Sequence, residues 1–127
     1  MAGIVHFSNF FVYMEQAEHQ FLRYVGLSVH QKTDQQTISW PRVAASCNYL
    51  QPIRFEDLIR IEVGIERLGK SSVTYQFNFF REHPPIDQVI ADGKLTAVCC
   101  AMDTDQGMHS IPIPENILQA LRPYTII

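Results

Sequence analysis

The stretch SNFFVYMEQAEHQFLRYVG, residues 8–26, decides the fold of this chain. Its apolar side chains recur at steps of four and three residues, which is the spacing of one face of an α-helix. The residues of this face are Phe10, Met14, Ala17, Phe21 and Tyr24. Ser8 or Asn9 can act as the N-cap, and Gly26 can adopt the left-handed conformation that ends a helix. We therefore predict an amphipathic helix over residues 9–25 that packs on a flat surface.

The remainder of the chain predicts a sheet. Four segments have the alternation or the turn boundaries that are typical of strands. They are residues 42–50, 58–68, 72–81 and 88–102. We expect a turn at Gly69-Lys70 and a bulge at Gly93, a loop over residues 27–40, and a short helix over residues 114–122. One long helix against four antiparallel strands gives an α+β fold, in which the apolar face of the sheet packs on the helix.

The composition fits one domain, residues 1–127, because 46% hydrophobic residues can form a core and exclude a disordered chain. The formal net charge of −3 gives no electrostatic case for nucleic acid or an anionic membrane. No run approaches the roughly 18 apolar residues of a transmembrane helix. The N-terminus lacks the basic region and the cleavage site of a signal peptide. We expect a cytoplasmic protein with no nucleic-acid or membrane partner.

The cysteines are Cys47, Cys99 and Cys100, an odd number with no C-x-x-C pair. Such a set favours neither a disulfide framework nor a zinc site. We interpret all three as reduced core or sheet residues; a thiol nucleophile is the alternative, although no His is close in sequence. The chain also lacks metal-ligand spacing and a glycine-rich phosphate loop, so we expect no metal and no cofactor.

Five stretches resemble, in order, one family of enzymes. They are residues 3–15 (GIVHFSNFFVYME), 40–43 (WPRV), 47–57 (CNYLQPIRFED), 66–72 (ERLGKSS) and 111–114 (IPIP). The set resembles the hotdog-fold thioesterases of the 4-hydroxybenzoyl-CoA thioesterase-like family, which include short-chain acyl-CoA thioesterases associated with the bacterial Tol–Pal system. The resemblance implies one long helix wrapped by an antiparallel sheet and hydrolysis of an acyl-CoA or aroyl-CoA thioester. It also implies a homodimer or homotetramer with the active site at the subunit boundary.

The sequence departs from this family at its start. The family's catalytic Asp belongs to a D-x-x-G motif, and since Gly3 fits the glycine, the Asp would precede Met1. The family's first strand is absent as well. We favour a shortened version of a longer product, because the rest of the pattern is intact. The other interpretation is a chain without the usual catalytic group, which would suit a non-catalytic acyl-CoA-binding module. A hotdog dehydratase is a further alternative, but the His and acidic residue that it needs have no matching motif.

Thioester hydrolysis needs a group that attacks or activates water, and donors for the developing oxyanion. The resemblance implies that the backbone N–H of Phe7, at the helix start, is an oxyanion donor; an ordinary capped helix start is the alternative. Glu15 and His6 are the candidate catalytic side chains. The alternatives are a solvated carboxylate and a packing or substrate-lining imidazole. We interpret Glu18 and His19 as surface residues, and no Ser-His-Asp triad is indicated.

Coenzyme A carries phosphates that bind Lys, Arg or backbone N–H groups. The resemblance places Lys70 at a phosphate contact and His109 near the nucleotide. Arg67, Ser71 and Asn9 are further candidate substrate contacts. The alternative for the turn residues is that they are simply solvated. The aromatic residues of the third strand segment are interpreted as core and interface, with an acyl pocket as the alternative: Tyr75, Phe77, Phe79 and Phe80.

Overall fold

The computed structural model describes residues 8–27, 31–32, 37–54, 56–83, 85–103 and 107–126. Along the chain these form helix α1 (Ser8–Tyr24), strands β1 (Gln31–Lys32), β2 (Thr37–Ser39), β3 (Arg42–Tyr49), β4 (Leu58–Leu68), β5 (Ser72–His83), β6 (Pro85–Val98), β7 (Cys100–Asp103) and β8 (Gly107–Ser110), helix α2 (Glu115–Leu121), and the short 3-10 helix η1 (Arg122–Tyr124). No helix in these ranges is long and apolar enough to cross a membrane.

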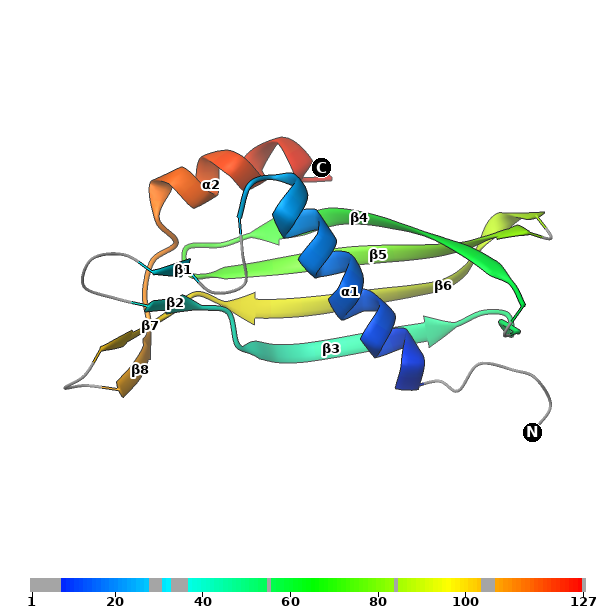
Figure 1. Ribbon diagram of the computed structural model, residues 1–127, viewed down its shortest axis with the longest axis horizontal. Coiled ribbons are helices and arrows are strands. Elements are labelled where there is room, and N and C mark those ends of the chain that lie inside the picture. The colour runs from blue at the N-terminus through cyan, green and yellow to red at the C-terminus, as the bar shows by residue number, and fades with distance from the viewer. Residues whose placement is uncertain are drawn as a thin grey trace.

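Helix α1 lies across one face of a large antiparallel sheet (Figure 1). The strand order of this sheet is β3-β6-β5-β4, and a smaller sheet of order β1-β2-β7-β8 lies at one end of it. The prediction of an α+β fold with one long helix on an antiparallel sheet is confirmed. Strands β3 and β4 form the two edges of the large sheet.

The inner face of β5 forms the centre of the core. Tyr75, Phe77 and Phe79 alternate along the strand and are 2%, 0% and 0% exposed. These three side chains fill the core, so their interpretation as core residues is confirmed. Phe80 lies on the opposite face of the sheet, where the guanidinium carbon of Arg60 is 4.6 Å from its ring centroid.

The buried line of α1 differs from the predicted one. Its buried residues are Phe10, Met14, Glu18, Phe21 and Leu22. Tyr24, which we expected on the packed face, is 77% exposed. Glu18, which we expected at the surface, is only 1% exposed, so that expectation was wrong. The buried line follows steps of four residues from Phe10 through Met14 to Glu18, so a carboxylate takes the third position in it.

Gly93 does not mark a bulge. It pairs in unbroken register with Cys47 on β3 and Phe77 on β5. A Cβ atom at this position would lie 2.3 Å from Sδ of Met14 and 3.0 Å from the carbonyl oxygen of Ser46. The glycine therefore leaves the space that the Met14 side chain of α1 occupies.

Two predicted segments need correction. Residues 27–40, predicted as a loop, contain β1 and β2. The strand predicted over residues 88–102 is interrupted at Cys99, whose N–H donates to the carbonyl of Ser71 (2.7 Å) and whose carbonyl accepts from Ile111 (2.9 Å). At Cys99 these two hydrogen bonds take the place of strand pairing in the large sheet, and the chain continues as β7 of the smaller sheet. The predicted C-terminal helix is confirmed as α2.

Candidate active site

Helix α1 begins beside the end of β3. The ring of Phe10 is 4.8 Å from that of Tyr49 on β3 and 5.3 Å from that of Phe79 on β5. Asn9 is half-buried in the first turn, and Glu15 is exposed one and a half turns later. His6 and Phe7 lie outside the described residues. A helix start presents unpaired N–H groups and the positive end of the helix dipole, which together can stabilise a developing negative charge.

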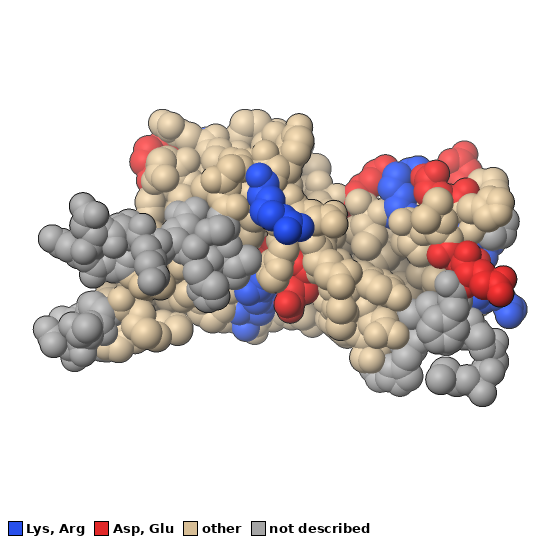
Figure 2. Space-filling view, viewed as in Figure 1, with Lys and Arg blue, Asp and Glu red and all other residues tan. Residues whose placement is uncertain are grey.

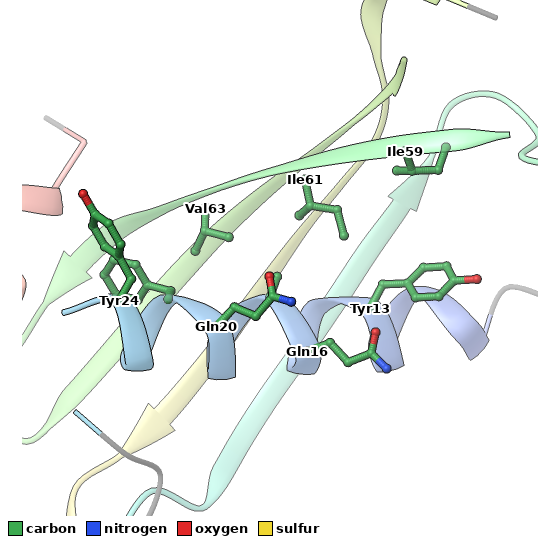
Figure 3. A pocket seen from close by; sticks show the side chains of 9 residues that line it. Tyr13, Gln16, Gln20, Tyr24, Ile59, Ile61 and Val63 are labelled. Carbon is green, nitrogen blue, oxygen red and sulfur yellow. The ribbon is translucent and has the colours of Figure 1, made fainter. Parts of the chain in front are cut away.

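A groove of about 570 Å³ runs between α1 and β4. Figure 3 shows that Ile59, Ile61 and Val63 of β4 point toward α1. The helix side of this α1–β4 groove is formed by Tyr13, Gln16, Ala17, Gln20, Phe21 and Tyr24. The aliphatic side chains of β4 give an apolar wall, while amide and phenol groups on α1 add hydrogen-bonding capacity. Such a combination, at this volume, is typical of a site for an organic group.

A buried ion pair fastens the other side of α1 to β3. Nη2 of Arg42 donates to Oε1 of Glu18, and Nη1 of Arg42 donates to the carbonyl of Trp40 (3.1 Å). Nε2 of His19 is 3.2 Å from Nη2 of Arg42. Sequence reasoning missed this cluster. The four-residue step that places Glu18 in line with Met14 could have indicated the burial of Glu18, but not its partner on β3.

The remaining candidate residues gather at the opposite end of the sheet from the α1 start. Arg67, Lys70 and Ser71 are at the β4–β5 turn, and His109 is on β8. The carbonyl of Lys70 accepts from Ile113 (2.8 Å), and that of Ser71 accepts from Cys99.

Along β5 this turn is separated by seven residues from Phe79, which touches the α1 start. That separation is about 23 Å at the usual rise of a strand. Within one protomer, the candidate phosphate-binding residues therefore do not meet Asn9 and Glu15.

The three cysteines are free; Cys99 and Cys100 are buried and Cys47 is half-buried. Burial raises the pKa of Cys99 to about 11 and also raises the pKa of Cys47. A raised pKa keeps a thiol protonated near neutral pH, whereas a thiol nucleophile needs a lowered pKa. The burial of these cysteines and their raised pKa values therefore agree with reduced structural residues. Among the described residues, no group of three His, Cys, Asp or Glu side chains could hold a metal ion.

Comparison with known proteins gives a consistent result. The model of the thioesterase superfamily matches residues 2–86. A candidate esterase from Aquifex aeolicus (strain VF5) is 28% identical over 120 residues, which cover 94% of this chain and 86% of the relative. A 1,4-dihydroxy-2-naphthoyl-CoA hydrolase from Prochlorococcus marinus (strain NATL2A) is 31% identical over 85 residues, which cover 61% of this chain and 55% of the relative.

A solved structure is similar over nearly the whole fold. It is a gentisyl-coenzyme A thioesterase with a TM-score of 0.74 and 26% identity, covering 95% of this chain and 89% of the other. The family match spans α1 and the strands through β5, which form the groove and both sheet edges. With its long helix on an antiparallel sheet, this hotdog-fold chain belongs to the thioesterase superfamily.

Proposed function

We propose that this protein hydrolyses an acyl-CoA or aroyl-CoA thioester to a carboxylic acid and coenzyme A. The observation that carries the proposal is the α1–β4 groove, which lies within the residues that match the thioesterase superfamily. Two relatives are named for aroyl thioesters, a dihydroxynaphthoyl-CoA and a gentisyl-CoA. Together with the aromatic rings on the helix side of the groove, these names favour an aroyl or a short acyl group. The free cysteines agree with a cytoplasmic place of action.

The acyl group would lie in the α1–β4 groove, with its carbonyl at the start of α1. There the N–H of Phe7 would donate to the carbonyl oxygen, and the helix dipole would stabilise the charge that develops on it. A water oxygen adds to the carbonyl carbon, the C–S bond then breaks, and the thiolate of coenzyme A takes up a proton. Glu15 and His6 are the side chains proposed to accept the proton of the attacking water.

The coenzyme A moiety would contact a second protomer. Strand β3 is one edge of the large sheet, and it exposes Val43 and Tyr49 by 62% and 42%. The start of β3 lies at the same end as the β4–β5 turn, because Arg42 pairs with Ala97 and Ala97 pairs with Val73. The end of β3 lies at the start of α1.

Antiparallel pairing of two β3 edges would therefore bring the β4–β5 turn of one protomer to the α1 start of the other. Lys70, Arg67 and Ser71 of that turn, with His109 nearby, would then bind the phosphates of coenzyme A. Asn9 would contact the substrate from the helix start. The active assembly in this proposal is a homodimer, alone or within a homotetramer.

The test is a panel of acyl-CoA and aroyl-CoA thioesters, with released coenzyme A measured by a thiol reagent. We expect turnover that Glu15→Gln or His6→Ala lowers in kcat, and that Lys70→Gln changes mainly in KM. Arg122→Gln is the matched control, because Arg122 is an exposed cation that pairs with Glu115 on α2. Binding of the thioesters without any release of coenzyme A would replace this proposal with a non-catalytic acyl-CoA-binding module.

A further inference from the structure

Strand β3 pairs with β6 on one side, and within the part of the chain that the structure describes no strand pairs on its other side. The N–H of Leu50, directly after β3, donates to the carbonyl of Ile90 (3.0 Å), so the peptide groups of Leu50 face β6. The direction of peptide groups alternates along a strand. The residues of β3 that present their N–H and C=O groups to the open edge are therefore Ala45, Cys47 and Tyr49.

The apolar side chains that β3 exposes lie near its two ends. They are Val43 and Tyr49. The register with β6 shifts between Arg42 and Ala44, so Val43 is the extra residue of a β-bulge. Alternation along the strand places Val43 on the same face as Tyr49, which is the face that contacts α1. Two copies of this edge can thus cover each other's apolar ends if the register is right.

An antiparallel pair of β3 edges about a two-fold axis at Ala45 would waste one end of the strand. Tyr49 would lie opposite the partner's Pro41, which has no N–H. The carbonyl of Pro41 already accepts from the N–H of Val98 (3.0 Å). The outward groups of Tyr49 would find no partner in this register.

An axis at Cys47 would waste the other end. Val43 would then lie opposite the partner's Gln51, which follows the end of β3. The N–H of Gln51 donates to the carbonyl of Ile90 (3.1 Å), so it is directed toward its own β6. The exposed side chain of Val43 would gain no apolar neighbour from the opposite strand in this register.

An axis at Ser46 keeps the whole pairing within β3. Each Ala45 then lies opposite the partner's Cys47, and both present outward N–H and C=O groups that can bond. Each Tyr49 lies opposite the partner's Val43, so the exposed apolar side chains cover each other. Ser46 meets the partner's Ser46 at the axis, on the face of the sheet away from α1.

The charge around this edge suits its burial. The segment VAASCNY, residues 43–49, has no charged side chain. Figure 2 shows the charged side chains of the α1 face gathered mainly at the end where β4 begins, while the border along β3 is largely uncharged. An isologous contact along β3 therefore removes no unpaired ion from water.

We propose that two copies of this chain pair through β3 about Ser46, and that Val43 of the partner subunit completes each active site. Tyr49 contacts Phe10 at the start of α1, where the proposed function places the thioester carbonyl. The partner's Val43, packed on Tyr49, would border the bound acyl group and limit its size. This role of Val43 rests on the proposed function, whereas the register of the pairing does not.

A cysteine cross-link tests the register, because a residue at the axis meets its own copy. In a Cys47→Ser background, Ser46→Cys places two thiols on Cα atoms about 4.5 Å apart, which a disulfide can bridge. We expect mild oxidation to link these protomers into dimers. Asn48→Cys in the same background is the matched control, since it is exposed on the same face. It lies opposite the partner's Ala44, so it should link only when mixed with Ala44→Cys.

Three outcomes of the cross-link would overturn the pairing. They are no link in Ser46→Cys, equal linking of Ser46→Cys and Asn48→Cys alone, and ready linking through Cys47 in the unmodified chain, which would put the axis at Cys47. None of these measurements needs hydrolysis. A failed pairing and a failed thioesterase are therefore distinguishable.

Mixing two variants tests the shared site. We expect Tyr49→Ala and Val43→Phe each to lower kcat/KM for aroyl-CoA about tenfold, since both sites of each homodimer carry one altered residue. A mixed dimer has one site with both native residues, Tyr49 from one protomer and Val43 from the other. The mixture should therefore exceed both pure variants in activity. Activity no higher than their mean would overturn the role of Val43. If the unmodified protein releases no coenzyme A, the proposed function fails and this role with it, while the cross-link still decides the pairing.

Discussion

The two sides of α1 are held in different ways. Toward β3 and β6 the helix is fastened, because Met14 fills the space above Gly93 and Glu18 pairs with Arg42. Toward β4 the same helix leaves a groove of about 570 Å³. The fastened side fixes the position of α1 on the sheet, and so it fixes the helix start and the shape of the groove. Substitutions on the fastened side should cost stability, whereas those on the groove side should change binding.

The largest effect is expected at the buried ion pair. Glu18→Ala should lower the free energy of unfolding by about 3 kcal/mol, because it leaves the guanidinium of Arg42 without its carboxylate in a largely buried place. The side chain of Arg42 is 27% exposed, which puts the cost at the low end for buried pairs. Replacing both partners, as Glu18→Leu/Arg42→Met, should cost less than Glu18→Ala alone. Chemical denaturation of the unmodified protein and of both variants measures these free energies of unfolding. A double variant that is less stable than Glu18→Ala would contradict this explanation.

Alkaline pH should lower the free energy of unfolding through Tyr75, a buried residue of β5. Burial raises the pKa of Tyr75 from 10 to about 12. The folded protein thus holds this proton more tightly than the unfolded chain, so its contribution is complete below pH 10 and is lost as the pH rises through 12. A rise of the pKa from 10 to about 12 corresponds to about 2.7 kcal/mol. Denaturation between pH 8 and pH 12 should therefore show a smaller alkaline loss for Tyr75→Phe than for the unmodified protein. Equal losses of stability in the two proteins would mean that a group other than Tyr75 causes the alkaline transition.

A slightly smaller effect is expected at the glycine beneath Met14. Gly93→Ala should destabilise by about 2 kcal/mol, because the new Cβ meets a fully buried side chain and a main-chain oxygen. Gly64→Ala is the matched control in β4. The three atoms nearest to its Cβ all belong to the exposed side chain of Ile126, which can move aside. Thermal or chemical unfolding should show that Gly93→Ala is clearly less stable than Gly64→Ala. Equal stabilities of the two variants would mean that the contact with Met14 is unimportant.

The elements of the fold were largely predictable, since period-four and period-two patterns depend on local sequence. The break at Cys99 was not predictable, because apolar alternation continues from Ala97 through Ala101 while the chain changes sheet. The burial of Glu18 depends on Arg42, which is 24 residues away. A helical pattern cannot reveal such a partner.

The site was less predictable than the fold. The groove exists only where α1 meets β4, elements that are separated by the whole of β1 to β3 in sequence. Lys70 and Asn9 could be singled out from sequence, but their separation within one protomer depends on the direction of β5. The groove and the separation of Lys70 from Asn9 could not be predicted for the same reason: each depends on contacts between segments that are distant in sequence.

The smallest effect on stability is expected on the groove side. Ala17 lines the groove and is half-buried, so Ala17→Leu adds volume where there is open space. The free energy of unfolding should change by no more than about 0.5 kcal/mol, as is usual away from packed features. If the proposed function is right, KM should rise for the bulkiest thioesters and change little for the smallest. Gln119→Leu, which places the same side chain at an exposed position of α2, should change neither quantity. A large loss of stability in Ala17→Leu would show that the groove closes in solution, and the two sides of α1 would then be fastened alike.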